Sequence, residues 1–274
     1  MKKLNREIGW RYDLPGPQVS CTLAPRIKRL NPPPNYFDDI VLELARTSIR
    51  SRAILFILGL AILMSSFSMI LFIVFEEATF FLRPSIELLT VIITVACSIY
   101  AGIPAVRFAL EIPRNEPVRF NRVRRKVYFY QYRFDQLRPF GRKGWGVKPV
   151  CYHWDDLTAE AYRTYVPGHG GLQEKVMISV SVPGTKKIID RLFFFDDIDL
   201  GEVHWSIARA YMNDGPSALP RFVHPPRDWD DFPNPGPWEN ATHRNPFDRL
   251  APKVKWPPEM DLESRTAGTA AHSP

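Results

Sequence analysis

The chain has 274 residues, a formal net charge of +7 and a mean hydropathy of −0.19. A mean hydropathy below zero excludes a protein that lies mostly inside a bilayer. The three cysteines, Cys21, Cys97 and Cys151, form no C-x-x-C pattern, so the sequence predicts neither a disulfide framework nor a thiolate metal site.

The first 52 residues fall into two parts. Residues 1–34 are rich in turn formers, such as Pro15-Gly16-Pro17 and Pro32-Pro33-Pro34, and predict an extended tail. Residues 35–52 predict a juxtamembrane helix that begins near Asp39, with Asn35 or Asp38 as its cap. The apolar side chains expected on one side of this helix are Ile40, Val41, Leu44 and Ile49.

Two long apolar runs follow, Ala53–Phe75 and Ile86–Phe108, with charges only near the ends of the second. At about 1.5 Å per residue, each run is long enough as a helix to cross the hydrocarbon core of a bilayer. They predict two transmembrane helices joined by a short external connector, residues 76–85. A buried core helix is the alternative, but such helices usually carry a polar stripe.

Basic residues flank this hairpin at both ends, and Lys and Arg resist translocation. We therefore expect a multi-pass membrane protein with both termini in the cytoplasm. The basic residues after or at the end of the second run are candidate contacts to lipid headgroups: Arg107, Arg114, Arg119, Arg122, Arg124, Arg125 and Lys126. The same charge does not predict nucleic-acid binding, because it begins where the chain leaves the bilayer.

The second run contains small residues at helical spacing. Ser98 with Gly102, and Ala101 with Ala105, would let another helix approach closely. They predict a candidate homo-oligomer contact, although ordinary membrane helices contain many such spacings. Hydroxyl side chains in both runs are expected to donate to carbonyls one turn earlier.

In residues 111–216 the pattern of side chains changes from helical spacing to the alternation typical of β-strands. The ranges 117–120, 126–133, 150–154, 157–165, 174–182 and 187–195 predict strands, and acidic residues at 196–199 start a helix that ends at Asn213-Asp214-Gly215-Pro216. About six strands and one C-terminal helix predict a cytosolic α+β domain. Its expected form is an antiparallel sheet or partly open barrel capped by the helix, similar to a pleckstrin-homology module.

Residues 217–274 form a Pro/Trp-rich tail that we expect to be extended and, at its end, disordered. Its tryptophans are costly to leave in water. We therefore take Trp229, Trp238 and Trp256 as candidate partner-binding residues.

A family resemblance rests on several of these segments in order. After the two runs come Glu116-Pro117-Val118-Arg119-Phe120-Asn121-Arg122, Arg125-Lys126-Val127-Tyr128, Trp154-Asp155-Asp156-Leu157, Trp205-Ser206-Ile207, Tyr211-Met212 and Gly215-Pro216. This order resembles a family of uncharacterised two-span membrane proteins of proteobacteria, a domain of unknown function often encoded beside type VI secretion effectors. The resemblance implies a location in the bacterial inner membrane and an immunity or accessory role toward a toxin, and it brings no catalytic residue.

The chain shows no nucleophile elbow, zinc-binding His-Glu-x-x-His, phosphate loop or dinucleotide fingerprint. His153 with Asp155 and Asp156 is the best cluster for acid–base chemistry, but a surface turn explains it better. We therefore expect no enzyme, cofactor or metal site. The favoured function is a membrane-anchored protein that captures a protein partner, such as a toxin effector or secretion component; a lipid-sensing module or an uncharted membrane enzyme is the alternative.

Overall fold

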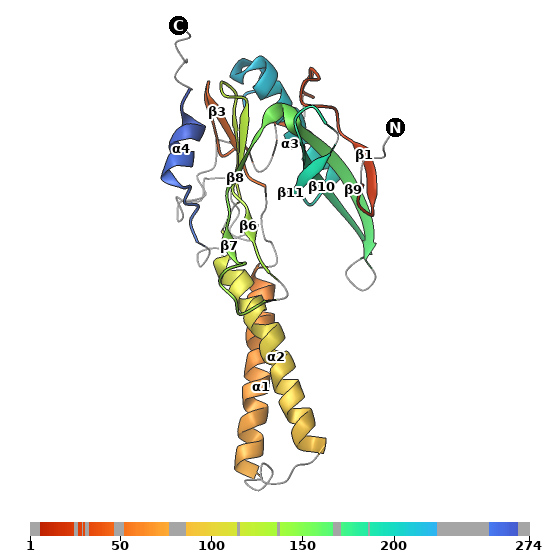
Figure 1. The fold of residues 1–274 in the computed structure, drawn as a ribbon, viewed down its shortest axis with the longest axis vertical. Helices are drawn as coiled ribbons and strands as arrows, with labels where there is room; N and C mark the ends of the chain where they lie inside the picture. Colours follow the sequence, from red (N-terminus) through yellow and green to blue (C-terminus); the bar gives the residue numbers. More distant parts are fainter. Residues whose placement is uncertain are drawn as a thin grey trace.

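The computed structural model describes residues 6–24, 27–28, 30, 33–46, 52–76, 86–113, 116–135, 138–166, 171–185, 187–223 and 252–267. It is elongated: two antiparallel helices project as a stalk from a domain built of β-sheets and one central helix (Figure 1). The predicted connector, residues 76–85, lies outside the described residues apart from Glu76.

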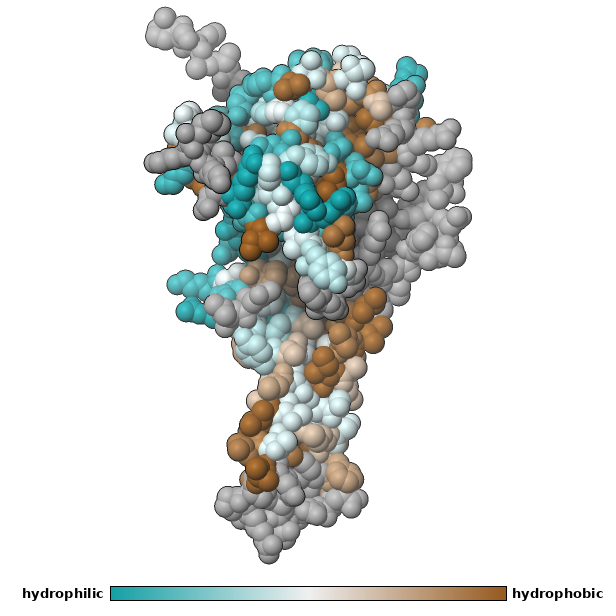
Figure 2. All heavy atoms as spheres, turned by 90° about the vertical axis from the view of Figure 1, so that its right-hand side faces the viewer, coloured by the Kyte–Doolittle hydropathy of each residue, from teal (hydrophilic) through white to brown (hydrophobic). Residues whose placement is uncertain are grey.

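The stalk consists of α1 (Arg52–Glu76) and α2 (Ile86–Glu111), and both are long and apolar enough to cross a membrane. Only 11% and 6% of the residues in their most apolar windows are buried. Hydrophobic side chains cover much of the stalk surface, whereas hydrophilic ones predominate on the domain above it (Figure 2). The predicted hydroxyl bonds are confirmed at Ser66, Thr90, Thr94 and Ser98, each of which donates to the carbonyl four residues earlier.

The two helices pack closely where both lack a large side chain. A Cβ atom at Gly102 would lie 2.8 Å from Leu63 and 3.1 Å from the carbonyl oxygen of Gly59. A Cβ atom at Gly59 would lie 3.0 Å from that of Ala105. Gly102 and Ala105, proposed above for a contact with a second copy, therefore face α1 of the same chain.

The chain enters and leaves the stalk from a five-stranded antiparallel sheet. Its strands, in order, are β2 (Tyr36–Phe37), β3 (Val41–Leu44), β4 (Val118–Asn121), β5 (Lys126–Phe129) and β8 (Val150–His153). Strand β3 precedes α1 and β4 follows α2, and these two strands pair with each other, since Val41 is opposite Asn121 and Leu44 is opposite Val118.

The predicted juxtamembrane helix over residues 35–52 is wrong in its described part, because residues 36–37 and 41–44 are strands. Asp38 does not start a helix; its Oδ1 accepts the backbone N–H groups of Ile40 and Val41 and forms a tight turn between β2 and β3. Pairing with β4 then extends the chain, so a partner distant in sequence overrides the local pattern.

A four-stranded antiparallel sheet contains β1 (Trp10–Asp13), β9 (Leu157–Val166), β10 (Gly171–Ser181) and β11 (Ile188–Phe195). A third pair, β6 (Tyr132–Arg133) and β7 (Gly146–Val147), lies next to the stalk (Figure 1). The N-terminal tail is thus part of the domain. Its β1 pairs with β9, and Leu14, Ile27 and Leu30 are buried in the core.

The predicted strands do not form the expected single sheet. They divide between the five-stranded and the four-stranded sheet, with residues 132–133 in the β6–β7 pair, and the sheets do not close into a barrel. The chain leaves the first sheet after β8, makes a short 3-10 turn at Trp154–Asp156 and enters the second as β9. Helix α3 (Ile198–Asp214) contacts strands of both sheets. Trp154 and Trp205, with ring centroids 4.8 Å apart and no exposed surface, fill the core at this junction.

The ends of α3 match the sequence prediction. Asp197 is its N-cap and accepts the backbone N–H of Leu200 at 2.8 Å. Gly215 follows the last turn with φ at +90°, a backbone conformation that residues other than glycine rarely adopt.

Candidate functional site

Residues 252–267, here named the C-terminal clasp, bind to the five-stranded sheet. The clasp contains α4 (Pro258–Arg265), which lies along the outer side of the sheet and contacts β4 (Figure 1). It reaches this place across a sequence separation of more than 120 residues. This surface brings together one of the three predicted partner-binding tryptophans and three of the seven predicted headgroup residues, Arg119, Arg124 and Lys126.

Trp256 anchors the start of the clasp. Its ring centroid lies 5.1 Å from that of Tyr130, and the guanidinium carbon of Arg119 lies 4.5 Å from the centre of the indole. The Tyr130 hydroxyl accepts the backbone N–H of Lys255 at 3.1 Å. An aromatic pair and a cation–π contact at one indole give the segment a fixed position.

Arg119 is the central charge of this surface. Its side chain is 5% exposed and pairs with Glu43 on β3 and with Asp261 on α4. It also donates to the Ser264 hydroxyl at 2.9 Å. A guanidinium between two carboxylates keeps its charge in a buried place, because both partners and its hydrogen bonds offset the loss of water.

The sheet also satisfies the C-terminal end of α4. The side-chain amide of Asn121, which is fully buried, donates to the carbonyls of Ser264 and Thr266 at 3.0 and 3.1 Å. Arg124 donates to the same Thr266 carbonyl at 2.9 Å. Unpaired carbonyls at a helix end carry partial negative charge, so an amide and a cation there stabilise a helix of only eight residues.

Charge complementarity extends along the clasp. Lys126 lies 2.5 Å from Glu263, and this hydrogen bond is the main cause that lowers the pKa of the Glu263 carboxyl. Burial acts to raise the pKa of Asp261, but hydrogen bonds from Arg119 and Arg265 outweigh it and the net shift is downward. Both carboxylates therefore favour the bound clasp while they are ionised.

The remaining predicted headgroup residues have other surroundings. Arg125 pairs with Asp155, and Arg122 lies beside Gly215. Arg107 pairs with Glu111 one turn later on α2. Buried Arg119 has no surface left for a headgroup, whereas headgroup contact by the others stays a prediction; Arg114, Trp229 and Trp238 lie outside the described residues.

In the structure, the hydrogen bonds to Asp155 come from Gln18 and Arg125 and not from His153. His153 is exposed at the end of β8. His204 lies in the core, where its ring stacks on Phe195 at 4.0 Å and burial lowers its pKa to about 4. It is held neutral by its surroundings and its Nδ1 contacts the Leu200 carbonyl at 2.8 Å.

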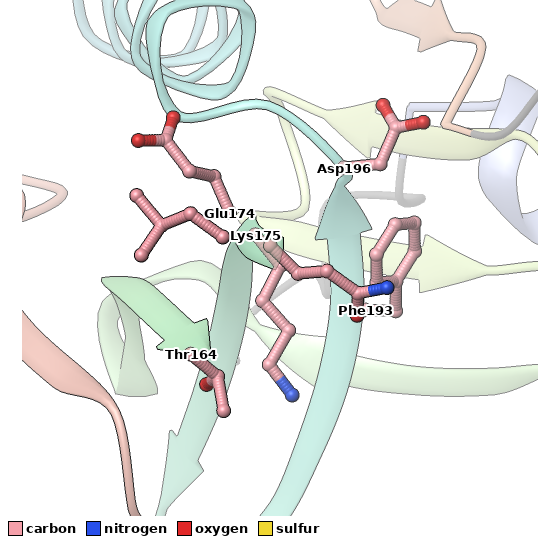
Figure 3. A pocket seen from close by; sticks show the side chains of 7 residues that line it. Thr164, Glu174, Lys175, Phe193 and Asp196 are labelled. Carbon is pink, nitrogen blue, oxygen red and sulfur yellow. The ribbon is translucent and has the colours of Figure 1, made fainter. Parts of the chain in front are cut away.

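An open depression of about 590 Å³ lies on the second sheet, at β9, β10 and the end of β11. Its lining residues are Thr164, Leu172, Gln173, Glu174, Lys175, Phe193 and Asp196. Figure 3 shows the Glu174 carboxylate and the Lys175 amine on opposite sides of β10, as strand alternation requires. Glu174 accepts a hydrogen bond from Arg163, and Leu172 and Phe193 add apolar surface, so the lining is mixed in polarity.

Sequence reasoning missed the contacts of two buried arginines near the domain-proximal end of the stalk. Arg46 is 3% exposed and donates to the carbonyls of Glu116, Phe193 and Tyr130 at 2.6–2.8 Å. Arg52 donates from the start of α1 to Ala109 and Pro113 at the end of α2. Their roles had no local signal, because the acceptors are backbone carbonyls from distant segments.

Comparison with known proteins identifies a family but no individual relative. No curated protein matches the chain, and no solved structure matches it. The family DUF6708, a family of unknown function, matches residues 95–234. This range takes in most of α2, β4 to β11 and α3, and covers half of the chain. The chain therefore belongs to the DUF6708 family.

Proposed function

We propose that the stalk crosses a membrane and tethers the β domain to its surface. The supporting observation is the exposure of large apolar side chains: Ile54, Phe72 and Ile86 are 66%, 66% and 81% exposed. In water, each such side chain would forgo about 1.5–3 kcal/mol of burial energy. Helices of 25 and 26 residues are each about 38 Å long, enough to span a bilayer.

Both flanks of the stalk lie on one side of this membrane in our proposal. The pairing of β3 with β4 supports this, because strands joined by hydrogen bonds cannot be in different compartments. Basic residues beside the stalk favour the cytoplasmic side of a bacterial inner membrane. Reporter fusions at the two ends of the chain test the arrangement, and opposite compartments would contradict it.

The domain's function, we propose, is to capture a protein partner through the surface that the clasp completes. The observation that carries this proposal is the clasp itself. The sheet holds an extended Lys255-Trp256-Pro257 segment and a short helix by an indole contact, ion pairs and hydrogen bonds from the Asn121 side-chain amide. Leu262 on α4 remains 67% exposed beside the ion-paired Asp261 and Glu263 and offers an apolar contact to a partner.

The nature of the partner comes from the resemblance to proteins encoded beside type VI secretion effectors. We propose that the partner is such an effector or another secretion component, and that the protein acts as an immunity or accessory factor. The pleckstrin-homology-like arrangement belongs to the same proposal. Its support is the order of strands followed by a C-terminal helix that packs on both sheets.

Affinity capture of the full chain from detergent-solubilised membranes tests the capture function. We expect a protein encoded by a neighbouring gene to be enriched, and we expect Trp256→Ala to lower its recovery several-fold. Leu262→Ala should lower recovery as well while leaving the clasp bound. In both variants the protein should remain in the membrane fraction after a carbonate wash.

Two outcomes would overturn the capture function. One is the absence of any enriched neighbour-encoded protein in the wild-type sample. The other is equal recovery with wild type and with a chain that ends at residue 251. Lys187→Gln, on an exposed turn of the other sheet, is the matched control and should not change recovery.

A further inference from the structure

The loop between β6 and β7 is fixed against the domain-proximal end of α2 (Figure 1). Arg107 of α2 donates to the carbonyls of Pro139 and Gly141 at 2.6 and 3.2 Å. Its guanidinium carbon lies 4.2 Å from the ring centre of Trp145, whose indole N–H donates to the Arg138 carbonyl at 3.1 Å. The loop therefore has a defined position on the stalk.

Phe140 at the tip of this loop points along the stalk. Its ring centroid is 6.2 Å from that of Tyr100, and its side chain is 54% exposed. Tyr100 precedes Arg107 by seven residues, so it lies about 10 Å further along the helix, toward the membrane-spanning part. The loop thus places an exposed aromatic ring beside the apolar span, while its carbonyls remain at the level of Arg107.

Basic residues predominate in this loop. Residues 138–148 contain Arg138, Arg142, Lys143 and Lys148, all four exposed, and no Asp or Glu, while Asp135 at the start of the loop lies beside Gly144. The nearest carboxylate on α2, Glu111, is engaged by Arg107 and by the Tyr132 hydroxyl. The loop therefore combines an apolar tip with a rim of net positive charge, as expected of a segment at the boundary between acyl chains and headgroups.

We propose that residues 138–145 form an interfacial loop that inserts Phe140 into the bilayer and binds the headgroups of anionic lipids through Arg138, Arg142 and Lys143. This inference rests on the proposal that the stalk crosses a membrane. The loop would hold the β domain at a fixed height and orientation over the lipid. A bilayer is the fitting partner because the ring of Phe140 lies beside α2, a helix that is apolar enough to span a membrane and has only 6% of its most apolar window buried.

Photocrosslinking of the full chain in vesicles tests the insertion. Three variants carry the photoreactive residue in turn: Phe140→benzoylphenylalanine on the loop, Ile92→benzoylphenylalanine on α2 and Val123→benzoylphenylalanine on the β4–β5 turn. Ile92 and Val123 are 55% and 53% exposed, which matches Phe140. We expect phospholipid adducts by mass spectrometry at 92 and 140 and none at 123.

The headgroup preference is tested in vesicles that contain equal amounts of neutral and anionic phospholipid. We expect anionic lipid to be enriched several-fold in the adducts at 140, since each basic residue near an anionic surface shifts such an equilibrium about fivefold. Arg138→Gln, Arg142→Gln and Lys143→Gln together should return the adducts to the bulk composition. Lys28→Gln, Lys187→Gln and Arg221→Gln remove the same charge from other exposed positions and should leave the enrichment unchanged.

The three labelled positions separate the two proposals. Lipid adducts at 92 without adducts at 140 would overturn the interfacial loop and leave the spanning stalk standing. The absence of adducts at both positions would overturn both. Adducts at 140 with no anionic enrichment, or enrichment that the control triple also removes, would overturn headgroup binding.

Discussion

In the stalk, Phe75 and Ile86 are each 81% exposed, whereas in the β domain Phe120 and Phe194 have no exposed surface. Charge shows the opposite distribution. The domain buries Arg46, Arg119 and Glu160, while the stalk keeps its charged residues at its ends. The same chain thus follows two sets of rules, which is expected if lipid is the solvent for one part and water for the other.

This contrast has a structural consequence. Each helix of the stalk satisfies its own backbone, and the contact between the two depends on small residues such as Gly59 and Gly102. The domain instead depends on polar contacts between segments that are distant in sequence. Single substitutions should therefore act differently in the two parts, and four measurements examine this difference, from the largest expected effect to the smallest.

The first substitution is Arg46→Ala. It removes the donor for three carbonyls, and each buried acceptor left without a partner costs about 1–3 kcal/mol. We expect the free energy of unfolding of the domain to fall by about 3 kcal/mol or more. Thermal unfolding in detergent, followed by the near-ultraviolet signal of the tryptophans, measures it, and the helical signal of the stalk should persist.

Arg133→Ala is the matched control for this substitution. Arg133 pairs with Asp190 at 3.2 Å, but its side chain is 43% exposed, so its loss should cost less than about 1 kcal/mol. Equal effects of the two substitutions would show that buried arginine contacts are not what distinguishes the domain from the stalk.

The second substitution, Gly102→Leu, acts on the stalk. Its Cβ would lie 2.8 Å from Leu63, and overpacking of this kind costs about 2 kcal/mol. We expect α1 and α2 to separate, which spin labels at the exposed positions Leu60 and Ile99 would report as a longer distance. The unfolding temperature of the domain should not change.

Ala101→Leu, one residue earlier and exposed, should leave the spin-label distance as in wild type. A separation equal to that caused by Gly102→Leu would mean that the close contact at Gly102 does not set the distance between the helices.

The third substitution, Trp256→Ala, removes the indole that contacts Tyr130 and Arg119. Loss of the aromatic and cation–π contacts should weaken the bound clasp by about 1–2 kcal/mol. Hydrogen exchange of the backbone amides of α4 should become faster, while amides of α3 keep their wild-type protection. Leu262→Ala, at a side chain that points to solvent, should have no such effect, and faster exchange there would argue against Trp256 as the anchor.

The fourth measurement is the pH dependence of the clasp. The pKa values of Asp261 and Glu263 are lower in the folded chain than in the unfolded chain, so their contribution is present above about pH 4.5 and is lost as pH falls through the lowered values. The side chains of Asp261 and Glu263 are 41% and 35% exposed, which limits the contribution of each to less than about 1 kcal/mol.

We therefore expect exchange of the α4 amides to accelerate, after correction for intrinsic rates, below about pH 4. Glu263→Gln together with Asp261→Asn should abolish this pH dependence. Acceleration on raising the pH from 5 to 7 would contradict the sign of both shifts.

The sequence by itself determined the elements whose signals are local. An apolar run of more than 20 residues predicts a helix long enough to span a bilayer, and alternation between turn residues gave most strands of the domain. Residues 196–199 and 213–216 marked the two ends of α3, where Asp197 caps the helix and Gly215 is left-handed, because such residues act on the nearest turn. The family resemblance agrees with the match to DUF6708 in that both concern a domain of unknown function.

Only the tertiary structure decided how these elements combine. Residues 41–44 form a strand because β4 is available beside them after the stalk, and the predicted strands divide into two sheets at Trp154. The partners of Arg119 lie 76 and 142 residues away along the chain. Long-range pairing leaves no periodic signal in the sequence, since the energy of a buried charge depends on which distant group replaces its water.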